Sequence, residues 1–249
     1  MDRAGSGLIR AACGGDAARE PRMIKLYFNL SPNPTKVVLA LEEMGLAYEP
    51  IVVDTRKGEQ FGPDYLRLNP NAKVPTLVDG DAVVFDSNAI LLYLAEKTGQ
   101  FGGPADGKGR GEFLSWAMFV ATGIGPFSGQ AVHFKHFAPE PVPYAHTRYQ
   151  YEVERHYRVL DERLAGRAFI AGDAYTVVDM AAWGWARMVP FILGDDAWSR
   201  FPNVKRLLDA ISARPAAQRV EEFRAKHGPA FKAEMDAEAR GHMFKHIAA

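Results

Sequence analysis

Cysteine is nearly absent from this sequence, since Cys13 is the only one among 249 residues. A single thiol excludes an internal disulfide framework, a zinc site built from thiolates and a CxxC redox pair. Chains without structural disulfides are typical of a reducing compartment, so we expect a cytoplasmic location. A histidine-based metal site is not indicated either. His133 and His136 stand three residues apart, but no carboxylate or cysteine adjoins them, and we expect no bound metal.

An excess of charge of either sign is also missing, because 30 basic and 30 acidic residues cancel. Nucleic-acid binding and docking on an anionic membrane surface both normally need a basic excess, so neither partner is expected. No apolar run approaches the roughly 20 residues that cross a bilayer, so no membrane span is expected either. The length and the apolar fraction of 47% suit one or two compact domains with a substantial core.

The first part of the chain alternates between strand and helix patterns. Short apolar runs bounded by turn formers predict strands at 24–28, 47–53, 76–78 and 83–85. Helical spacing predicts one helix that starts at Pro34 or Thr35 and stops at Gly45, and further helices at 63–68 and 87–98. The resulting order, β-α-β-α-β-β-α, predicts a thioredoxin-like α/β domain at residues 23–99.

A glycine-rich stretch at residues 100–111 predicts a linker after this domain. No strand pattern returns beyond it. An all-helical domain is expected at 112–215, with helices at 113–134, 144–164, 177–192 and 204–213. Thr176 and Asp179 fit the start of one of these helices, where both side chains can accept free N–H groups. Regular periodicity is missing at both ends, and we expect a disordered tail at 1–22 and a surface-wrapping C-terminal extension at 216–249.

The segment from Leu68 to Leu94 contains two features that suit a peptide ligand. Val74-Pro75 stands just before a strand, and a cis bond there would turn the Val74 backbone outward to pair with an extended peptide. Asp86-Ser87 offers free N–H groups and a hydroxyl at a helix N-terminus, which suits a carboxylate. Taken singly, each feature also occurs in ordinary turns and caps.

In this order, N-x-K-V-P-T-L followed by D-S-N-A-I-L-x-Y-L resembles the glutathione-binding half of the soluble glutathione transferases. S-P-N-P-T-K-V, K-G-E-Q-F, G-I-G-P-F-S-G-Q-A-V-H-F and P-x-P-Y-A-x-x-R-Y-Q are similar to the bacterial Nu-class enzymes and their Ure2-like relatives. The resemblance spans about residues 23–215. It implies glutathione as co-substrate and a two-fold homodimer, in which the first domain of one subunit meets the helical domain of the other. The glutathione contacts that it implies are Gln60, Lys73, Val74, Pro75, Asp86, Ser87 and Arg148.

The loop S-P-N-P-T, between the first strand and the first helix, contains no cysteine, so the bound glutathione thiol would itself be the nucleophile. A thiol is mostly protonated at neutral pH, and such an enzyme gains from donors aimed at the sulfur. Ser31 and Asn33 are the expected donors. Tyr27 is the rival, because several transferase classes use a tyrosine late in the first strand. Ser31 and Asn33 could also serve only as turn caps.

The related branch consists of disulfide-bond reductases with weaker conjugation and peroxidase activity, so the resemblance implies a glutathione-dependent reductase of small disulfides. Two alternatives stay open: a transferase that mainly conjugates electrophiles, and a non-catalytic Ure2-like binding protein. The sequence departs from the branch at two positions. Ser31 replaces a threonine and lacks the methyl group that fixes the rotamer. Asp86 replaces the more usual glutamate, which shortens the reach to the ligand's amino group.

Overall fold

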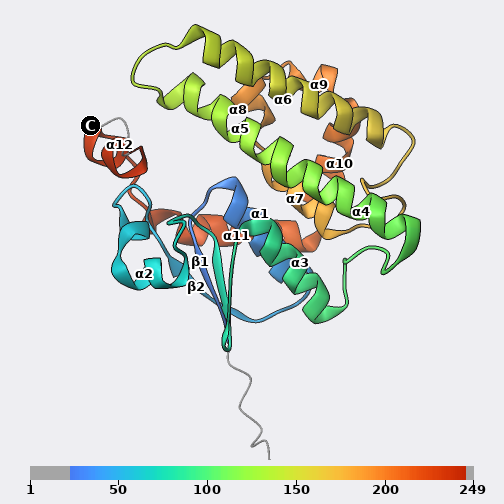
Figure 1. Cartoon of the computed structure of the whole chain (residues 1–249), viewed down its shortest axis with the longest axis horizontal. Coiled ribbons are helices and arrows are strands. Elements are labelled where there is room, and N and C mark those ends of the chain that lie inside the picture. Colours follow the sequence, from blue (N-terminus) through green and yellow to red (C-terminus); the bar gives the residue numbers. More distant parts are fainter. Residues whose placement is uncertain (1–22, 245–249) are drawn as a thin grey trace, which may run out of the picture.

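The computed structural model describes residues 23–244, so the tail expected at 1–22, with Cys13, lies outside the described residues. A four-stranded sheet forms the first half of the chain and helices form the second (Figure 1). The strands are β1 Ile24–Phe28, β2 Tyr48–Val52, β3 Thr76–Asp79 and β4 Ala82–Phe85. Their order is β2-β1-β3-β4, with β1 parallel to β2 and antiparallel to β3. The expected thioredoxin-like domain is confirmed.

Three helices accompany the sheet, namely α1 Pro32–Glu43, α2 Pro63–Leu68 and α3 Ser87–Thr98. The bounds of α2 and α3 are as expected, whereas α1 begins earlier than Pro34. Ser31 adopts the extended backbone of an N-cap, and Pro32 fits the first helical turn because no N–H donor is needed there. The buried residues of β1 alternate, with Leu26 and Phe28 fully buried and Tyr27 on the opposite face of the sheet.

The second half is helical, as expected, but its boundaries differ. Its helices are α4 Gly107–Phe119, α5 Gly125–Val132, α6 Pro143–Leu164, α7 Val177–Ala186, α8 Val189–Leu193, α9 Ala197–Arg200 and α10 Pro202–Ser212. Helix α4 begins inside the stretch expected to be a linker, because glycine weakens a helix without forbidding it and Asp106 precedes the first turn. Two π-helical turns, Val120–Ile124 and His133–Phe137, interrupt the expected 113–134 helix.

Helix α7 is the centre of the helical domain, since all of its residues are buried. The expected capping box at its start is confirmed. The Thr176 hydroxyl accepts the Val178 N–H at 3.3 Å, and the Asp179 carboxylate accepts the Thr176 and Ile170 N–H groups at 2.8 Å each. Burial raises the pKa of Asp179 to about 6. The helix expected to run to 192 ends at Ala186, and α8 starts anew with proline in its first turn.

The C-terminal extension wraps the first domain and contains helices that the sequence pattern did not predict. Helix α11 spans Pro215–His227, and α12 spans Ala237–Met243 (Figure 1). Phe223 of α11 packs on Phe28 of β1, with ring centroids 4.8 Å apart. The buried stripe of α11 is built mainly from alanines and Val220, so its apolar period is weak in the sequence.

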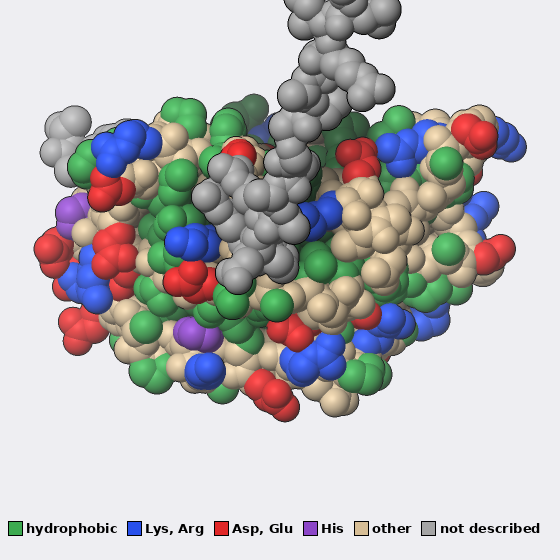
Figure 2. Space-filling view, turned by 90° about the horizontal axis from the view of Figure 1, so that it is seen from below, with side chains coloured by type: hydrophobic (Ala, Val, Ile, Leu, Met, Phe, Trp, Pro, Cys, Tyr) green, Lys and Arg blue, Asp and Glu red, His purple; other side chains and the backbone are tan. Residues whose placement is uncertain are grey.

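No helix within residues 23–244 is both long and apolar enough to cross a membrane. Within the same residues, no group of three or more His, Cys, Asp or Glu side chains is placed to hold a metal ion. Figure 2 shows basic and acidic side chains interspersed over one face of the molecule, in keeping with the balanced charge of the sequence.

Candidate active site

The backbone at Ser31 is held from several sides, while its hydroxyl makes no capping hydrogen bond. The Ser31 N–H donates to Asn29 Oδ1 at 2.9 Å, and the Ser31 carbonyl accepts from Thr35 Oγ1 at 2.9 Å. Arg224 of α11 donates to the Leu30 carbonyl at 2.7 Å and to Thr35 Oγ1 at 3.0 Å. These hydrogen bonds hold the loop in place, while the Ser31 hydroxyl at the N-terminal end of α1 takes no part in capping the helix.

Asn33 is oriented by the helical domain. Its Oδ1 accepts a hydrogen bond from Trp185 Nε1 of α7 at 3.0 Å. An indole N–H can only donate, so the oxygen of the Asn33 amide must face Trp185 and the Nδ2 group must face away. Asn33 can therefore offer only donors from its Nδ2 end. This contact could not be predicted from the sequence, because Asn33 and Trp185 are 152 positions apart.

Tyr27 lies on the face of the sheet that α2 covers. Its ring packs on Tyr65, with centroids 5.8 Å apart and planes inclined by 56°. Both tyrosines line a cavity of about 250 Å³ between the edge of β2 and α2. Tyr27 thus packs against α2, whereas Ser31 and Asn33 stand at the start of α1.

The segment that leads into β3, with Lys73, Val74 and Pro75, is held by a side chain of α2 and by the residue that follows α2. The Val74–Pro75 peptide bond is cis, as expected. Tyr65 Oη and Asn69 Nδ2 donate to the Lys73 carbonyl, at 2.6 and 2.7 Å. The Lys73 side chain is exposed, and Pro75 is buried. Tyr65 and Asn69 were missed in the sequence, because a residue that supports a loop from beneath leaves no motif of its own.

The start of α3 differs from the expectation in one respect. Asp86 Oδ1 accepts the N–H groups of Asn88 and Ala89, at 2.8 and 3.1 Å. Two N–H groups expected to be free are therefore already bonded, because a short aspartate in the N-cap position reaches its own helix. Asp86 itself has a positive φ of 70°, which is rare for a residue with a side chain and common at functional sites. Ser87, the next residue, is buried.

Gln60 lies in the short 3-10 turn Glu59–Phe61 and is only 4% exposed. Its Nε2 donates to the Thr55 carbonyl at a long 3.4 Å. Its Oε1 is buried and has no hydrogen-bond partner among residues 23–244. An unpaired buried amide oxygen is costly, and a ligand N–H would relieve that cost.

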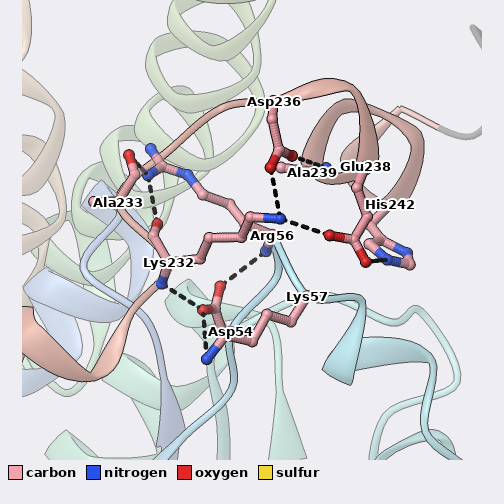
Figure 3. Close-up of polar contacts among 9 residues, drawn as sticks. All are labelled: Asp54, Arg56, Lys57, Lys232, Ala233, Asp236, Glu238, Ala239 and His242. Atoms are coloured by element: carbon pink, nitrogen blue, oxygen red, sulfur yellow. Dashed lines mark hydrogen bonds and ion pairs between the residues drawn. The ribbon is translucent and has the colours of Figure 1, made fainter.

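Asp54 links the loop that carries Gln60 to the C-terminal extension, as Figure 3 shows. The buried Asp54 carboxylate accepts the N–H groups of Arg56 and Lys232, at 3.0 and 2.6 Å. Arg56 donates in return to the carbonyls of Lys232 and Ala233, at 2.7 Å each. The extension therefore clamps this loop, a role that its sparse apolar pattern did not reveal.

Arg148 is not brought together with these residues within one chain. It lies on α6, where its guanidinium donates to Glu152 Oε1 at 2.8 Å, and its side chain is half exposed. Tyr144 and Tyr151 are strongly exposed and share its side of the helix, since residues three and four apart lie on one face. Arg148 thus belongs to an exposed, partly aromatic face of α6.

A buried lysine in α1 was also missed. Lys36 is 1% exposed, and its Nζ donates to Asn88 Oδ1 in the first turn of α3 at 2.9 Å. Burial lowers the pKa of Lys36 to about 7, and the negative charge of Asp86 only partly offsets this effect. A lysine in a polar run is normally read as exposed, so the sequence pattern could not identify it.

Comparison with known proteins agrees with this arrangement. The family model for the glutathione S-transferase N-terminal domain matches residues 30–97, and the model for the C-terminal domain matches residues 144–215. The chain belongs to the glutathione transferase family of enzymes. The disulfide-bond oxidoreductase YfcG of Escherichia coli is 42% identical over 208 residues, which cover 78% of this chain and 92% of YfcG.

Two solved transferases are similar in structure. URE2P6 of Phanerochaete chrysosporium, in complex with oxidized glutathione, has a TM-score of 0.77 at 36% identity and covers 82% of this chain and 97% of its own. A transferase from Burkholderia graminis, with two glutathione molecules bound per subunit, has a TM-score of 0.75 at 40% identity, covering 82% and 89%. The resemblance to the bacterial and Ure2-like branch is confirmed.

Proposed function

We propose that this enzyme is a glutathione-dependent disulfide reductase, in which the thiolate of bound glutathione attacks a small disulfide. The observation that carries the proposal is the start of α1, where the Ser31 hydroxyl makes no capping bond and Asn33 presents only donors. The name of YfcG and the oxidized glutathione in URE2P6 support the same chemistry. The packing of Tyr27 on Tyr65 favours Ser31 over Tyr27 as the donor.

The proposed reaction has two exchange steps. Ser31 and Asn33 donate hydrogen bonds to the glutathione sulfur and lower its pKa, and the positive end of the α1 dipole acts in the same direction. The thiolate attacks one sulfur of the disulfide, forms a mixed disulfide and releases the other sulfur as a thiolate. A second glutathione thiolate then attacks the mixed disulfide, which gives oxidized glutathione and the second product thiol. The two glutathione molecules bound per subunit of the Burkholderia graminis relative support a site that can hold both reactants of this second step.

The remaining predicted residues hold the tripeptide in this proposal. The Val74 backbone, turned out beside Pro75, pairs with the cysteinyl peptide unit, and Ser87 binds the γ-glutamyl carboxylate through its hydroxyl and its own N–H. The Asp86 oxygen that does not cap α3 faces the amino group. Gln60 accepts a ligand N–H, and the exposed ammonium of Lys73 suits the second carboxylate. Conjugation and peroxide reduction would use the same thiolate as side activities.

We also propose a two-fold homodimer. Large exposed apolar side chains lie on the outer strand of the sheet and on two helices of the helical domain: Val83, Phe85, Leu114, Met118, Tyr144 and Tyr151. This distribution supports a pairing in which each domain meets the other domain of the second copy, and in such a dimer Arg148 would lie near the interface. A particle near 27.5 kDa in size-exclusion chromatography would contradict the dimer.

The test is an assay with glutathione and hydroxyethyl disulfide, followed through the oxidized glutathione formed. We expect a rate well above the uncatalysed exchange. A protein that neither binds glutathione nor accelerates this exchange would refute the proposal. Faster conjugation of chlorodinitrobenzene than disulfide reduction would favour the conjugating alternative, and tight binding without turnover would favour the non-catalytic one. A cytoplasmic setting is part of the proposal, because the reaction consumes reduced glutathione.

A further inference from the structure

The helical domain contributes one hydrogen bond to the catalytic loop of the other domain. Trp185 is 8% exposed on α7, and its indole N–H reaches Asn33 Oδ1 at 3.0 Å. Trp185 is not part of any motif used to predict the site, and it does not itself stand at the start of α1. Its only polar group is directed at a proposed catalytic side chain.

Glycines bring the indole this close and leave room for it. A Cβ atom at Gly184 would lie 2.9 Å from the Pro32 carbonyl oxygen and 3.0 Å from Lys36 Cβ, so α7 can approach α1 only because residue 184 has none. At the start of α5, a Cβ at Gly125 would lie 3.2 Å from Trp185 Nε1. Helices α1, α7 and α5 thus fix the indole in one place.

A carboxamide has two orientations that differ by exchange of its oxygen and nitrogen. With the Asn33 oxygen on the Trp185 N–H, the Nδ2 donors face away from the indole. In the reversed orientation, two N–H groups would oppose each other and the amide oxygen would face the sulfur. A lone-pair oxygen next to a thiolate is repulsive, so only the first orientation lowers the pKa of the bound thiol.

We propose that Trp185 is a positioning residue for the reaction, because its indole N–H holds the Asn33 amide with the Nδ2 donor end, and not the oxygen, toward the sulfur of bound glutathione. The inference rests on the proposed function, in which Asn33 donates to the thiolate. The helical domain thereby sets the reactivity of a thiol bound by the other domain.

The helix supplies its own control. Trp183 lies two residues earlier on α7, is 1% exposed, and donates its indole N–H to Ser212 Oγ, also at 3.0 Å. Trp183→Phe and Trp185→Phe therefore each remove one buried indole hydrogen bond from the same helix. Both are expected to lower the thermal stability by a similar amount, and only Trp185→Phe is expected to change the chemistry.

The readout is the pKa of bound glutathione, titrated through the ultraviolet absorbance of its thiolate, together with the pH profile of the disulfide exchange rate. Trp185→Phe should raise the thiol pKa and slow the reaction ~3- to 10-fold at neutral pH, which is less than the loss expected when a donor that acts alone is removed. The difference in rate from the wild type should vanish at a pH at which the thiol is fully ionised. Trp183→Phe should leave both unchanged. A wild-type thiol pKa in Trp185→Phe, or an equal shift in Trp183→Phe, would overturn the positioning role.

Two variants of Asn33 separate this inference from the function beneath it. Asn33→Ala should raise the thiol pKa at least as far as Trp185→Phe; if it has no effect, Asn33 is not a donor and the proposed function fails at this residue. If Asn33→Ala raises the thiol pKa and Trp185→Phe does not, only the positioning role of Trp185 is refuted.

If Trp185→Phe does not fold, Asn33→Asp is the deciding variant, because its carboxylate can still accept a hydrogen bond from Trp185 but cannot donate one. It should be slower than Asn33→Ala, and wild-type activity there would overturn the inference.

Discussion

The first turns of α1 and α7 use their polar side chains in opposite ways, although the two helices lie against each other. At α7, the Thr176 hydroxyl and the fully buried Asp179 carboxylate bond to the backbone of their own turn and to Ile170. At α1, the Ser31 hydroxyl makes no capping bond, and the Asn33 amide is turned outward by a distant indole. A helix start whose groups are satisfied internally stabilises the fold, whereas one with unused donors can serve a ligand.

The largest loss of stability is expected at the start of α7, where the polar side chains bond to the backbone. Asp179→Ala leaves the N–H groups of Ile170 and Thr176 unpaired in the core, so the free energy of unfolding should fall by ~3 to 5 kcal/mol. Urea unfolding measures this loss. Asp173→Ala, at an exposed position just before α7, is the control and should change stability by less than ~0.5 kcal/mol. A loss below ~1 kcal/mol in Asp179→Ala would mean that the capping box is not a main support of α7.

The next effect concerns Lys36, one turn after Asn33 in α1. Its pKa is lowered to about 7 from an ordinary 10.5, so between those values the unfolded chain binds a proton that the folded chain does not. The free energy of unfolding must therefore rise with pH across this window, by about 3 kcal/mol between pH 7 and 10. Urea unfolding of wild type and Lys36→Met at several pH values isolates the contribution. Equal pH slopes would contradict the burial of a neutral lysine.

Removing one hydroxyl from the start of α7 and one from the start of α1 tests the difference between these two helix starts directly. Thr176→Ala should cost ~1 to 2 kcal/mol of stability and leave the bound thiol unchanged. Ser31→Ala should leave stability unchanged and slow disulfide exchange at neutral pH by ~10-fold, since Asn33 still donates. Both variants are measured for their free energy of unfolding and for their rate of disulfide exchange, and each should be changed in only one of the two quantities. A Tyr27→Phe variant that is crippled while Ser31→Ala remains active would move the catalytic role to the tyrosine.

The smallest effect is expected for Ser31→Thr. Threonine keeps the hydroxyl and restricts its rotamer, so kcat/KM should stay within ~3-fold of wild type, in either direction. Steady-state kinetics with hydroxyethyl disulfide provide the measurement. A steep loss would show that the pocket excludes the added methyl group, and the correspondence between Ser31 and the threonine of the related branch would then be wrong.

The sequence predicted those features that depend on neighbouring residues. The strands, the bounds of α3 and the capping box at Thr176 all follow from local period, turn formers and side-chain reach. The order of motifs around Val74-Pro75 and Asp86-Ser87 sufficed to identify the family before any geometry was known. Local signals also misled at the start of α3, because the same Asp86 that marks this start accepts hydrogen bonds from two N–H groups expected to be free.

The features that could not be predicted depend on contacts between distant segments. Trp185 reaches Asn33 from the other domain, and Arg224 reaches the Leu30 carbonyl from a helix whose own pattern is weak. Lys36 is buried only because α3 and α7 close over α1, which no run of polar residues reveals. These tertiary contacts decide which polar groups are satisfied internally and which are left for a ligand.

The most direct test of the account is the pKa of the glutathione thiol in the complex with the unmodified enzyme, measured by ultraviolet titration of the thiolate. Donors at the start of α1 should hold this pKa at least ~1 unit below the value of about 8.5 typical of a free thiol, and Ser31→Ala should recover much of the difference. A bound thiol that titrates at the free value would contradict the central claim. So would a lowered pKa that survives the loss of both Ser31 and Asn33.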